Sequence, residues 1–378
     1  MGSIEPYEVA SGRRYRVRYR DPEHAQRLRA GFPTKHSAEE FLASITVSKS
    51  RGEYVDPAEA KVTISSLAAE WLENQSHLKP SSARPLEIAW RRQVAPRWSK
   101  VRLSDVRYSS VQAWVTKLST ERSASTVIRA YGVLAALLNV AVRDRRLLSN
   151  PARGVKLPRK VGKEKVYLSH EQVELLAANS GDQATLVQFL AYTGLRWGEV
   201  TALRISNLDS LRRRKNVTRN AVMVGGTIHE GTPKSHESRN VPFPAFLSAP
   251  LAKLGEGKSR EDLIFGDGRT FLRPPDVRNG WWVRAPASAR ELDPSFPPSL
   301  TRHDLRHTAA SLAVSAGANV KAVQRLLGHA SAAMTLDVYA DLFDDDLDAV
   351  AAALDRARSE KSVHFLLTLP KSVNDKTP

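Results

Sequence analysis

A basic stretch near the middle of the chain, NPARGVKLPRKVGKEK at residues 150–165, separates a first region from a second. Proline and glycine interrupt it and its apolar residues follow no regular spacing, which is typical of a linker. The chain has 378 residues, enough for two or three domains of roughly 150 residues each. We assign the linker itself to residues 153–165, and its charge predicts that it runs along a phosphate backbone.

Residues 1–60 are predicted to form a small module with a three-stranded sheet and one helix. In RRYRVRYR, at residues 13–20, cationic and apolar side chains alternate, and a strand has a period of two. HAQRLRAGF is a candidate partner strand, and Ser37 with Glu40 forms a predicted capping box that opens the helix. One strand face carries four cations with no acid among them, which favours DNA contact over a merely solvated face. The four are Arg14, Arg16, Arg18 and Arg20.

Residues 61–152 are predicted to form a compact helical domain. ISSLAAEWLENQ, SSVQAWVTKL and STVIRAYGVLAALLNVAV each place apolar residues three and four positions apart, the spacing of an amphipathic helix. Three prolines are predicted to lie in the connections between these helices. They are Pro80, Pro85 and Pro96.

Residues 166–360 are predicted to form a mostly helical domain that begins at a capping box of Ser169 and Gln172. One interruption, AVMVGGTI followed by HEGTPKSHESR and NVPFP, predicts a β-hairpin or small sheet with Lys234 at its exposed turn. A tail follows at residues 361–378, and its apolar run VHFLLTL is expected to dock on its own domain or on a second copy. The chain is therefore predicted to be multidomain and mainly α with small β-sheets, in the α+β class.

The chain is strongly basic, with 57 Lys and Arg against 40 Asp and Glu, a net charge of +17 and a pI near 10.1. A surplus of this size makes a polyanion the expected partner, either nucleic acid or an anionic membrane surface. No stretch approaches about 18 uninterrupted apolar residues, and the start MGSIEP has no apolar signal region. The absence of cysteine excludes disulfides, thiolate zinc sites and a cysteine nucleophile. We therefore expect an intracellular protein that binds nucleic acid.

Two short segments of the last domain gather cationic and imidazole side chains. AYTGLRWGEV, at residues 191–200, places Arg196 and Glu199 on one face of a helix expected to begin at Thr193–Gly194. TRHDLRHTAASL, at residues 301–312, places three such side chains on one helix face. They are His303, Arg306 and His307. A histidine pair four residues apart can bind metal, but the zincin pattern is missing because no Glu follows the first histidine. A solvated helix face and an anion-binding cluster are the remaining alternatives.

Six residues in a fixed order connect these segments. They lie in TGLRWGE, the turn that carries a lysine, HDLRH, LLGH and the last tyrosine of the chain, and they are Arg196, Lys234, His303, Arg306, His329 and Tyr339. In this order and these contexts they resemble the active site of the tyrosine recombinases, the phage integrase family. The resemblance covers nearly the whole chain. It implies that residues 1–60 are an arm-type DNA-binding domain, 61–152 a core-type DNA-binding domain and 166–360 the catalytic domain.

The residue types suit chemistry at a phosphodiester. Attack on phosphorus builds negative charge on the non-bridging oxygens, and Arg196 and Arg306 can each present two planar donors to them. No carboxylates suited to two metals cluster near these motifs, so we expect neither a metal nor another cofactor. Tyr339 is the predicted nucleophile, and the cationic pocket has to favour its phenolate because an ordinary tyrosine has a pKa of about 10. The resemblance implies a 3′-phosphotyrosyl linkage and a free 5′-hydroxyl.

The other residues receive supporting roles. Lys234 is the candidate general acid that protonates the departing 5′-oxygen. His303 is expected to assist proton transfer or to bond the phosphate, and His329 to donate to a non-bridging oxygen. Glu199 is expected to orient an arginine or a histidine, and His307 to act through packing or support.

The spacing before the last tyrosine departs from the pattern of many family members. They place the tyrosine nine positions after the histidine of LGH, whereas Tyr339 follows His329 by ten. We expect the small residues of ASAAM to absorb the additional position. No tyrosine follows Tyr339, so the chain offers no rival at its end.

The resemblance implies a site-specific recombinase that integrates and excises a temperate phage or a similar element without ATP. It implies a homotetramer on double-stranded DNA with arm-type and core-type attachment sites, a Holliday-junction intermediate and action in a bacterial cytoplasm. A host DNA-bending factor and an excision-directing factor are expected partners. Three alternatives are weaker. A non-catalytic DNA-binding regulator would not need the six residues in this order, and the first module and the LLGH context argue against a type IB topoisomerase. A membrane-surface protein would need a basic amphipathic helix with large exposed apolar residues, and the sequence shows none.

Overall fold

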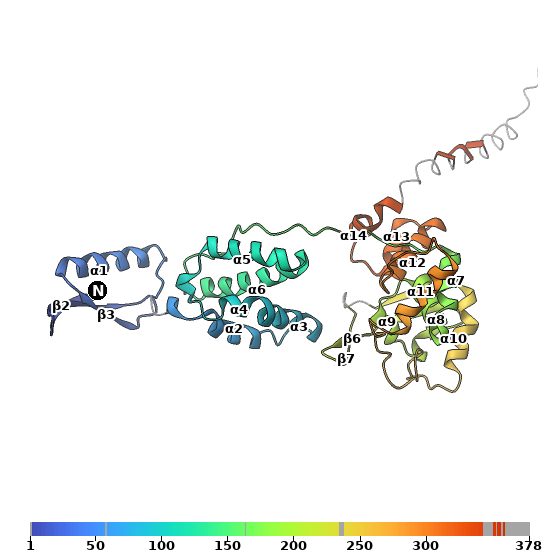
Figure 1. The fold of residues 1–378 in the computed structure, drawn as a ribbon, viewed down its shortest axis with the longest axis horizontal. Coiled ribbons are helices and arrows are strands. Elements are labelled where there is room, and N and C mark those ends of the chain that lie inside the picture. Colours follow the sequence, from blue (N-terminus) through green and yellow to red (C-terminus); the bar gives the residue numbers. More distant parts are fainter. Residues whose placement is uncertain are drawn as a thin grey trace, which may run out of the picture. The chain divides into compact units, whose positions relative to one another are not determined.

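The computed structural model describes residues 2–342 apart from 57–58, 163 and 234–237, together with residues 351–352, 354–356 and 358–359. The chain divides into two compact units, Met1–Gly162 and Lys163–Pro378. The first unit holds a small sheet module followed by a helical domain, and the second is mostly helical with two small sheets (Figure 1). The architecture that was predicted from the sequence, mainly α with small sheets, is confirmed.

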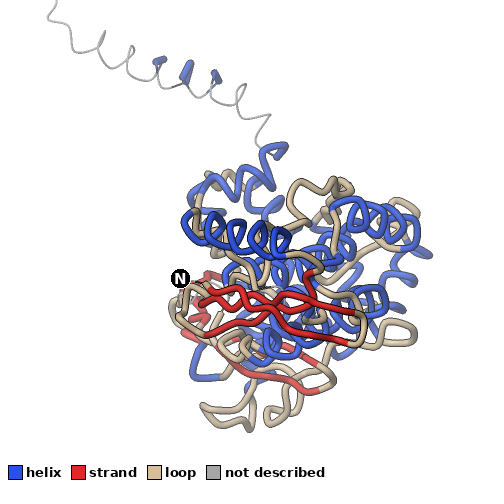
Figure 2. The backbone as a smooth tube through the Cα atoms, turned by 90° about the vertical axis from the view of Figure 1, so that its left-hand side faces the viewer, coloured by secondary structure: helices blue, strands red, loops and turns tan. Residues whose placement is uncertain are grey.

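The first module is an antiparallel sheet with strand order β1-β2-β3 and one helix. Its elements are β1 (Ser3–Val9), β2 (Gly12–Arg20), β3 (Gln26–Phe32) and α1 (Lys35–Ser50). Because side chains alternate along β2, Val17 and Tyr19 are buried in one cluster with Ala38 and Ile45 of α1. By the same alternation, Arg14, Arg16, Arg18 and Arg20 lie on the opposite face of the strand. Strands are drawn in red in Figure 2.

Helix α1 begins earlier than predicted. Thr34 is the N-cap and Ser37 is the third helical residue, and the two form a reciprocal capping box. The predicted box of Ser37 with Glu40 is therefore wrong by one turn. The Thr34 hydroxyl accepts from the Ser37 backbone N–H at 3.1 Å, so an equally good cap is available three residues upstream.

The helical domain of the first unit packs around its longest helix, α6. Its helices are α2 (Ile64–Glu73), α3 (Pro80–Ala89), a π-helical turn η2 (Trp90–Val94), α4 (Ala95–Trp98), α5 (Tyr108–Glu121) and α6 (Ala124–Arg143). Among the described residues, α6 alone is long and apolar enough to cross a membrane by length and composition. Its apolar stripe, which includes Val133, Leu134 and Leu137, is buried in the core of this domain.

Two of the three prolines do not lie in connections. Pro80 opens α3, but Pro85 lies inside that helix and Pro96 lies in the first turn of α4. Between the two helices the backbone widens into the π-turn η2, in which the N–H of Ala95 donates to the carbonyl of Trp90. A wider turn of this kind relaxes the regular hydrogen-bond ladder, which helps a helical path to tolerate a proline without a donor.

The second unit is built from helices that surround small sheets. Its helices are α7 (His170–Ala178), α8 (Ala184–Thr193), α9 (Trp197–Thr201), α10 (Ser248–Gly255), α11 (Trp281–Leu292), α12 (Asp304–Ser315), α13 (Val320–Leu327) and α14 (Ala332–Tyr339). Its strands are β4 (Leu208–Asp209), β5 (Arg214–Val217), β6 (Asn220–Val224), β7 (Thr227–Gly231) and β8 (Arg239–Pro242). The capping box predicted at Ser169 and Gln172 is confirmed.

The strand pairing differs from the predicted hairpin. β6 pairs with β7 across Gly225 and Gly226, whereas β8 pairs with β5 in a separate sheet of order β4-β5-β8. Both glycines have positive φ, 61° and 89°, so they form the tight two-residue turn between β6 and β7. The lysine predicted at the turn before NVPFP, Lys234, lies outside the described residues, as does the VHFLLTL run of the tail.

Candidate active site

The second unit brings together three side chains that are far apart in the sequence. Arg196 caps the start of α9, Arg306 lies in the first turn of α12, and Tyr339 is the last residue of α14. The positive charges of both arginines act on the Tyr339 hydroxyl, so the three groups share one site. In Figure 1 the helices α8, α9, α12, α13 and α14 belong to the same body.

The segment that leads into Arg196 differs from the prediction. Thr193 and Gly194 do not open a helix, because α8 ends at Thr193 and Gly194 is its C-cap in the left-handed region, with φ of 64°. Arg196 then serves as the N-cap of the short helix α9. The tight turn between the two helices presents the arginine at a helix end instead of on a helix face.

Arg306 is buried, with 3% of its surface exposed. Its Nη1 donates to the carbonyl of Gly194 and its Nη2 to the carbonyl of Leu327, each at 2.6 Å. It thereby ties α12 to the ends of α8 and α13. Burial, with a smaller effect of the Arg196 charge, lowers the pKa of Arg306 to about 9, so the group stays cationic at neutral pH. Since two of its N–H groups bond the backbone, the others remain for a phosphate oxygen.

Glu199 is a fully enclosed carboxylate that holds two arginines. It is 1% exposed, and its Oε2 and Oε1 accept from the backbone N and the Nη1 of Arg196, both at 3.0 Å. Arg239 adds two bonds to the same carboxylate, from Nη1 at 3.0 Å and from Nη2 at 2.7 Å. Burial raises the pKa of Glu199, but the bonds and charge of Arg239 and Arg196 outweigh it, so the net shift is downward.

Sequence reasoning missed Arg239. It opens β8 five residues after Lys234, and its guanidinium lies against Gly328, where an added Cβ would be 2.7 Å from Arg239 Cδ. Arg239, Arg325 and His329 line part of an adjoining cavity of about 460 Å³. The signal that was available is the basic residue in ESRNVPFP, but its carboxylate partner, Glu199, lies 40 positions away.

Lys215 is a second residue that sequence reasoning missed. It lies on β5 and is 0% exposed, and within the part of the chain that the structure describes its Nζ has no hydrogen-bond partner. Burial lowers its pKa well below the ordinary value for lysine, although the charge of Glu199 acts in the opposite direction.

Tyr339 is 1% exposed and its hydroxyl lies 2.8 Å from Nδ1 of His307. Its ring packs in a cluster with Val323 and Leu327 of α13. Burial raises the pKa of Tyr339 to about 12, although the charges of Arg306 and Arg196 lower it. The two cations favour the phenolate, as expected, but the desolvation of the phenol outweighs them.

The remaining histidines surround the tyrosine in different ways. The His329 ring stacks on the Tyr339 ring at 6.3 Å and 11°, and its Nδ1 lies 3.0 Å from Oγ1 of Thr335. Burial and then the Arg306 charge lower the pKa of His329 to about 4, so its ring is neutral at pH 7. When Nδ1 accepts a hydrogen bond from the Thr335 hydroxyl, the ring proton lies on Nε2, which can donate a hydrogen bond to a phosphate. His303 is exposed and its ring meets that of His307 edge-on at 5.1 Å.

A residue of the predicted linker reaches the tyrosine. Lys165 donates from Nζ to the carbonyl of Val338 and lies 5.8 Å from the centre of the Tyr339 ring. Three residues later, the backbone N–H of Leu168 donates to the hydroxyl of Thr308 in α12 at 3.1 Å. The end of the linker is thus attached to the helices that carry the site. Lys165, the last residue of the linker, bonds the carbonyl of Val338, whereas the sequence predicted that the linker's charge would face a phosphate backbone.

Four of the five arginines of β2, Arg14, Arg16, Arg18 and Arg20, alternate with Val17 and Tyr19 and lie on the open face of the sheet in the first unit. No acid stands among these arginines along β2 itself, but Glu5 of the neighbouring strand β1 lies opposite Arg16. Glu5 pairs with Arg16 at 2.9 Å and with Arg18 at 3.3 Å. Sequence reasoning about β2 alone could not include this acid, because it comes from a neighbouring strand. Arg14 and Arg20 lie at either side of this pair along β2.

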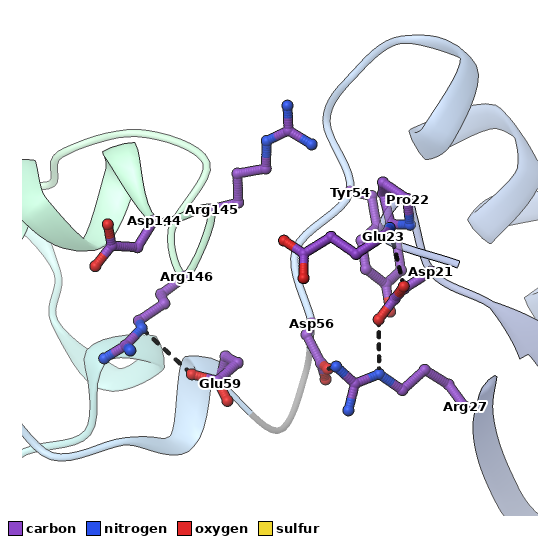
Figure 3. A pocket seen from close by; sticks show the side chains of 10 residues that line it. All are labelled: Asp21, Pro22, Glu23, Arg27, Tyr54, Asp56, Glu59, Asp144, Arg145 and Arg146. Carbon is purple, nitrogen blue, oxygen red and sulfur yellow. Dashed lines mark hydrogen bonds and ion pairs between the residues drawn. The ribbon is translucent and has the colours of Figure 1, made fainter. Parts of the chain in front are cut away.

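The first unit also contains a cavity of about 290 Å³ lined by five carboxylates and three arginines (Figure 3). Arg27 bonds Asp21 at 2.9 Å and Arg146 pairs with Glu59 at 3.2 Å. Its acidic lining makes this cavity unsuited to a phosphate. Over the described residues, no group of three or more His, Cys, Asp or Glu side chains is arranged to hold a metal ion.

Known proteins resemble this chain in sequence and in fold. Residues 166–345 match the model of the phage integrase family. The integrase of Mycobacterium phage L5 is 27% identical over 256 residues, which cover 65% of this chain and 66% of that integrase. The match spans 63% of a putative prophage phiRv2 integrase of Mycobacterium tuberculosis and 66% of the L5 integrase, just under two thirds of the length of each.

Two solved structures share the fold. A Tn1549 transposon integrase in complex with transposon right end DNA has a TM-score of 0.65 and 21% identity, covering 77% of this chain and 100% of that one. A lambda integrase tetramer bound to a Holliday junction has a TM-score of 0.52 and 16% identity, covering 86% of this chain and 95% of that one. The site lies within the matched segment, and we conclude that residues 166–345 of this chain form a domain of the phage integrase family.

Proposed function

We propose that this protein is a site-specific tyrosine recombinase that cuts and rejoins DNA through a 3′-phosphotyrosyl intermediate at Tyr339. The observation that carries the proposal is that the buried Arg306 and the partly exposed Arg196 both act on the buried hydroxyl of Tyr339 and lower its pKa. Two guanidinium groups suit the two non-bridging oxygens of a phosphodiester, and they stabilise the charge that develops when phosphorus is attacked.

The other side chains supply proton transfer and hydrogen bonds. Lys234 is the proposed acid that protonates the departing 5′-oxygen. His329 donates from Nε2 to a non-bridging oxygen, which its neutral ring and its contact with Thr335 permit. His303, which is exposed at the start of α12, assists at the phosphate. Glu199 keeps Arg196 in place through two hydrogen bonds.

The first unit supplies DNA binding in this proposal. Residues 1–60 bind arm-type sites through the open sheet face, residues 61–152 bind core-type sites, and residues 153–165 link them to the catalytic domain at 166–360. The net charge of +17 supports a DNA partner.

The assembly and the biological role are proposed from the relatives. The lambda integrase tetramer was solved on a Holliday junction, and an equivalent homotetramer is proposed here. The protein then integrates and excises a phage or other mobile element in the cytoplasm and nucleoid of a bacterial host. A host DNA-bending factor and an excision-directing factor are proposed partners, and neither a metal nor ATP takes part.

A suicide DNA substrate tests the reaction. Genomic fragments selected by the purified protein supply the duplex, and a nick beside the cleavage position lets the short 5′-product diffuse away. Wild-type protein is expected to become covalently attached to DNA, and Tyr339→Phe is expected to give no covalent product on a denaturing gel. Tyr192→Phe is the matched control, because Tyr192 bonds His170 away from the site and should not affect attachment. Covalent attachment by Tyr339→Phe would overturn the proposal.

A further inference from the structure

The hydroxyl of Tyr339 has one protein hydrogen-bond partner among the described residues, the imidazole of His307. Nδ1 of His307 lies 2.8 Å from the phenolic oxygen, and the two rings meet at 62°. We propose that His307 is the catalytic base that takes the proton of Tyr339 during strand cleavage. This inference rests on the proposed function and assigns a direct role to a residue that the sequence placed in a supporting position.

The two other histidines are not placed for this role. The His329 ring lies nearly parallel to the Tyr339 ring, and its Nδ1 is directed to Thr335. A stacked ring does not direct a nitrogen lone pair at the hydroxyl of its neighbour. His303 contacts His307 rather than the tyrosine. The geometry therefore singles out His307.

The surroundings of His307 keep its ring neutral. The groups that face it are His303, Asp304 and Arg306 from its own helix, Lys165 from the linker and the phenol of Tyr339 from α14. Burial, followed by the charges of His303, Lys165 and Arg306, lowers the pKa of His307 below 6.5, against the opposing effect of Asp304. Nδ1 of a neutral ring can accept a proton at pH 7, and the Asp304 carboxylate favours the imidazolium that results.

A base is needed because the phenol does not ionise by itself. With a pKa of about 12, Tyr339 is a phenolate in roughly one molecule in 10⁵ at pH 7. Removing the proton while the bond to phosphorus forms avoids that rare species, and general-base catalysis typically contributes about 10²–10⁴-fold.

The step balances in both directions. The Tyr339 oxygen forms a bond to phosphorus, the bond from phosphorus to the 5′-oxygen breaks, and the phenolic proton moves to Nδ1 of His307. The 5′-oxygen receives a different proton from the acid on the opposite side of the phosphorus, which is Lys234 in the proposed function. In the rejoining step the 5′-hydroxyl attacks, and His307 returns its proton to Tyr339.

The two sides of the reaction can be separated with a substrate that carries a 5′-bridging sulfur. A thiolate leaves without a proton, so this substrate removes the need for the acid but not for the base. His307→Gln is expected to form the covalent complex about 10²-fold more slowly on both the oxygen and the sulfur substrates. Lys234→Ala is expected to be slow on the oxygen substrate and to recover on the sulfur substrate. His170→Gln removes the equivalent histidine of the His170–Tyr192 pair, which is bonded at 2.7 Å, and should behave as wild type.

The pH profile is a readout that a packing role would not change. Wild-type cleavage should be independent of pH near neutrality and decline below pH 6.5 as His307 becomes protonated. The rate for His307→Gln should instead rise tenfold per pH unit, because only hydroxide then removes the phenolic proton. Full recovery of His307→Gln on the sulfur substrate, or an unchanged profile with less than about a threefold loss, would overturn the inference.

A measurement on the wild-type protein covers the case in which the variant does not fold. The ¹⁵N shifts of His307 in the full chain should show Nδ1 unprotonated and Nε2 protonated at pH 7, and a proton on Nδ1 would contradict the proposal. If wild-type protein attaches to no DNA at all, the proposed function itself fails. If wild type and His307→Gln attach equally fast, only the role of His307 is lost.

Discussion

Arginines occur in two contrasting settings in this protein. On β2 they lie on an open sheet face, where Arg16 and Arg18 keep side-chain exposures of 35% and 41% and share Glu5. In the second unit Arg306 is 3% exposed and bonds two backbone carbonyls from other helices. The exposed arginines attract a polyanion through their charge. The buried arginine is held in one orientation by its two backbone bonds, so its donors are placed for a specific geometry of the bound anion.

Replacing the buried arginine is expected to have the largest effect on the rate of covalent attachment. Arg306→Lys keeps the charge but cannot bond the carbonyls of Gly194 and Leu327 in the same planar geometry. Covalent attachment to the suicide substrate should slow by at least about 10²-fold. The free energy of unfolding in urea should fall by about 2 kcal/mol, since a buried carbonyl loses its partner.

The same exchange on the open face provides the control. Arg14→Lys should leave the free energy of unfolding within about 0.5 kcal/mol of wild type. An equal decrease in the free energy of unfolding for Arg306→Lys and Arg14→Lys would contradict the contrast between the buried and the open arginines.

Replacing the enclosed carboxylate is expected to reduce stability more than Arg306→Lys does, but to slow covalent attachment less, because Glu199 acts only through the arginines that it holds. Glu199→Gln leaves Arg196 and Arg239 without their shared anion, and the free energy of unfolding at pH 7 should fall by about 3 kcal/mol. The pKa of Glu199 is lowered by folding, so its contribution is complete above about 4.5 and is lost as the pH falls through the lower folded value. Urea unfolding at several pH values should therefore show wild type and variant converging on acidification.

Glu5→Gln is the surface counterpart of this variant. It should change the free energy of unfolding by less than about 1 kcal/mol, because exposed ion pairs contribute little. A constant difference between wild type and Glu199→Gln from pH 7 to pH 3 would contradict the assignment of the charge of Glu199.

The smallest expected effect concerns DNA binding by the first module. Replacing Arg14, Arg16, Arg18 and Arg20 with glutamine should weaken binding to arm-type DNA and reduce its logarithmic salt dependence by at most about 3.6. The reduction should be smaller in practice, because Glu5 already neutralises part of this face. Filter binding at several salt concentrations measures it, and cleavage of core DNA should stay largely intact.

Glu5→Gln sharpens the same comparison by changing the opposite charge. It frees Arg16 and Arg18 from their shared acid, so affinity for arm-type DNA should increase. Equal loss of arm binding and core cleavage in the four-arginine variant would count against separate roles for the two units.

The sequence predicted those parts of the fold that depend on local pattern. Apolar spacing located the helices of the first unit, and Ser169 with Gln172 marked the start of α7. Strand partners were harder, because the turn at Gly225 and Gly226 decided the pairing of β6 and excluded β8 from it. In the site, residue order identified Arg196, Arg306 and Tyr339, whose charges do interact.

The partners of these residues could not be predicted from a single sequence. Arg239 matters through Glu199, 40 positions earlier, and Lys165 reaches Val338 across 173 positions. Glu5 neutralises Arg16 only because the strand register sets them opposite each other. The pKa of Tyr339 depends on how deeply α14 is packed, and no local pattern records that depth.

Gly194 limits how this part of the protein can vary. Its φ of 64° disfavours any side chain, and a Cβ at this position would be 2.6 Å from Cδ2 of Leu327. Its carbonyl also supports Arg306. A methyl group added here would push on Leu327 of α13 and on Ala309 of α12. The turn that supports Arg306 therefore depends on a position that admits only a hydrogen atom.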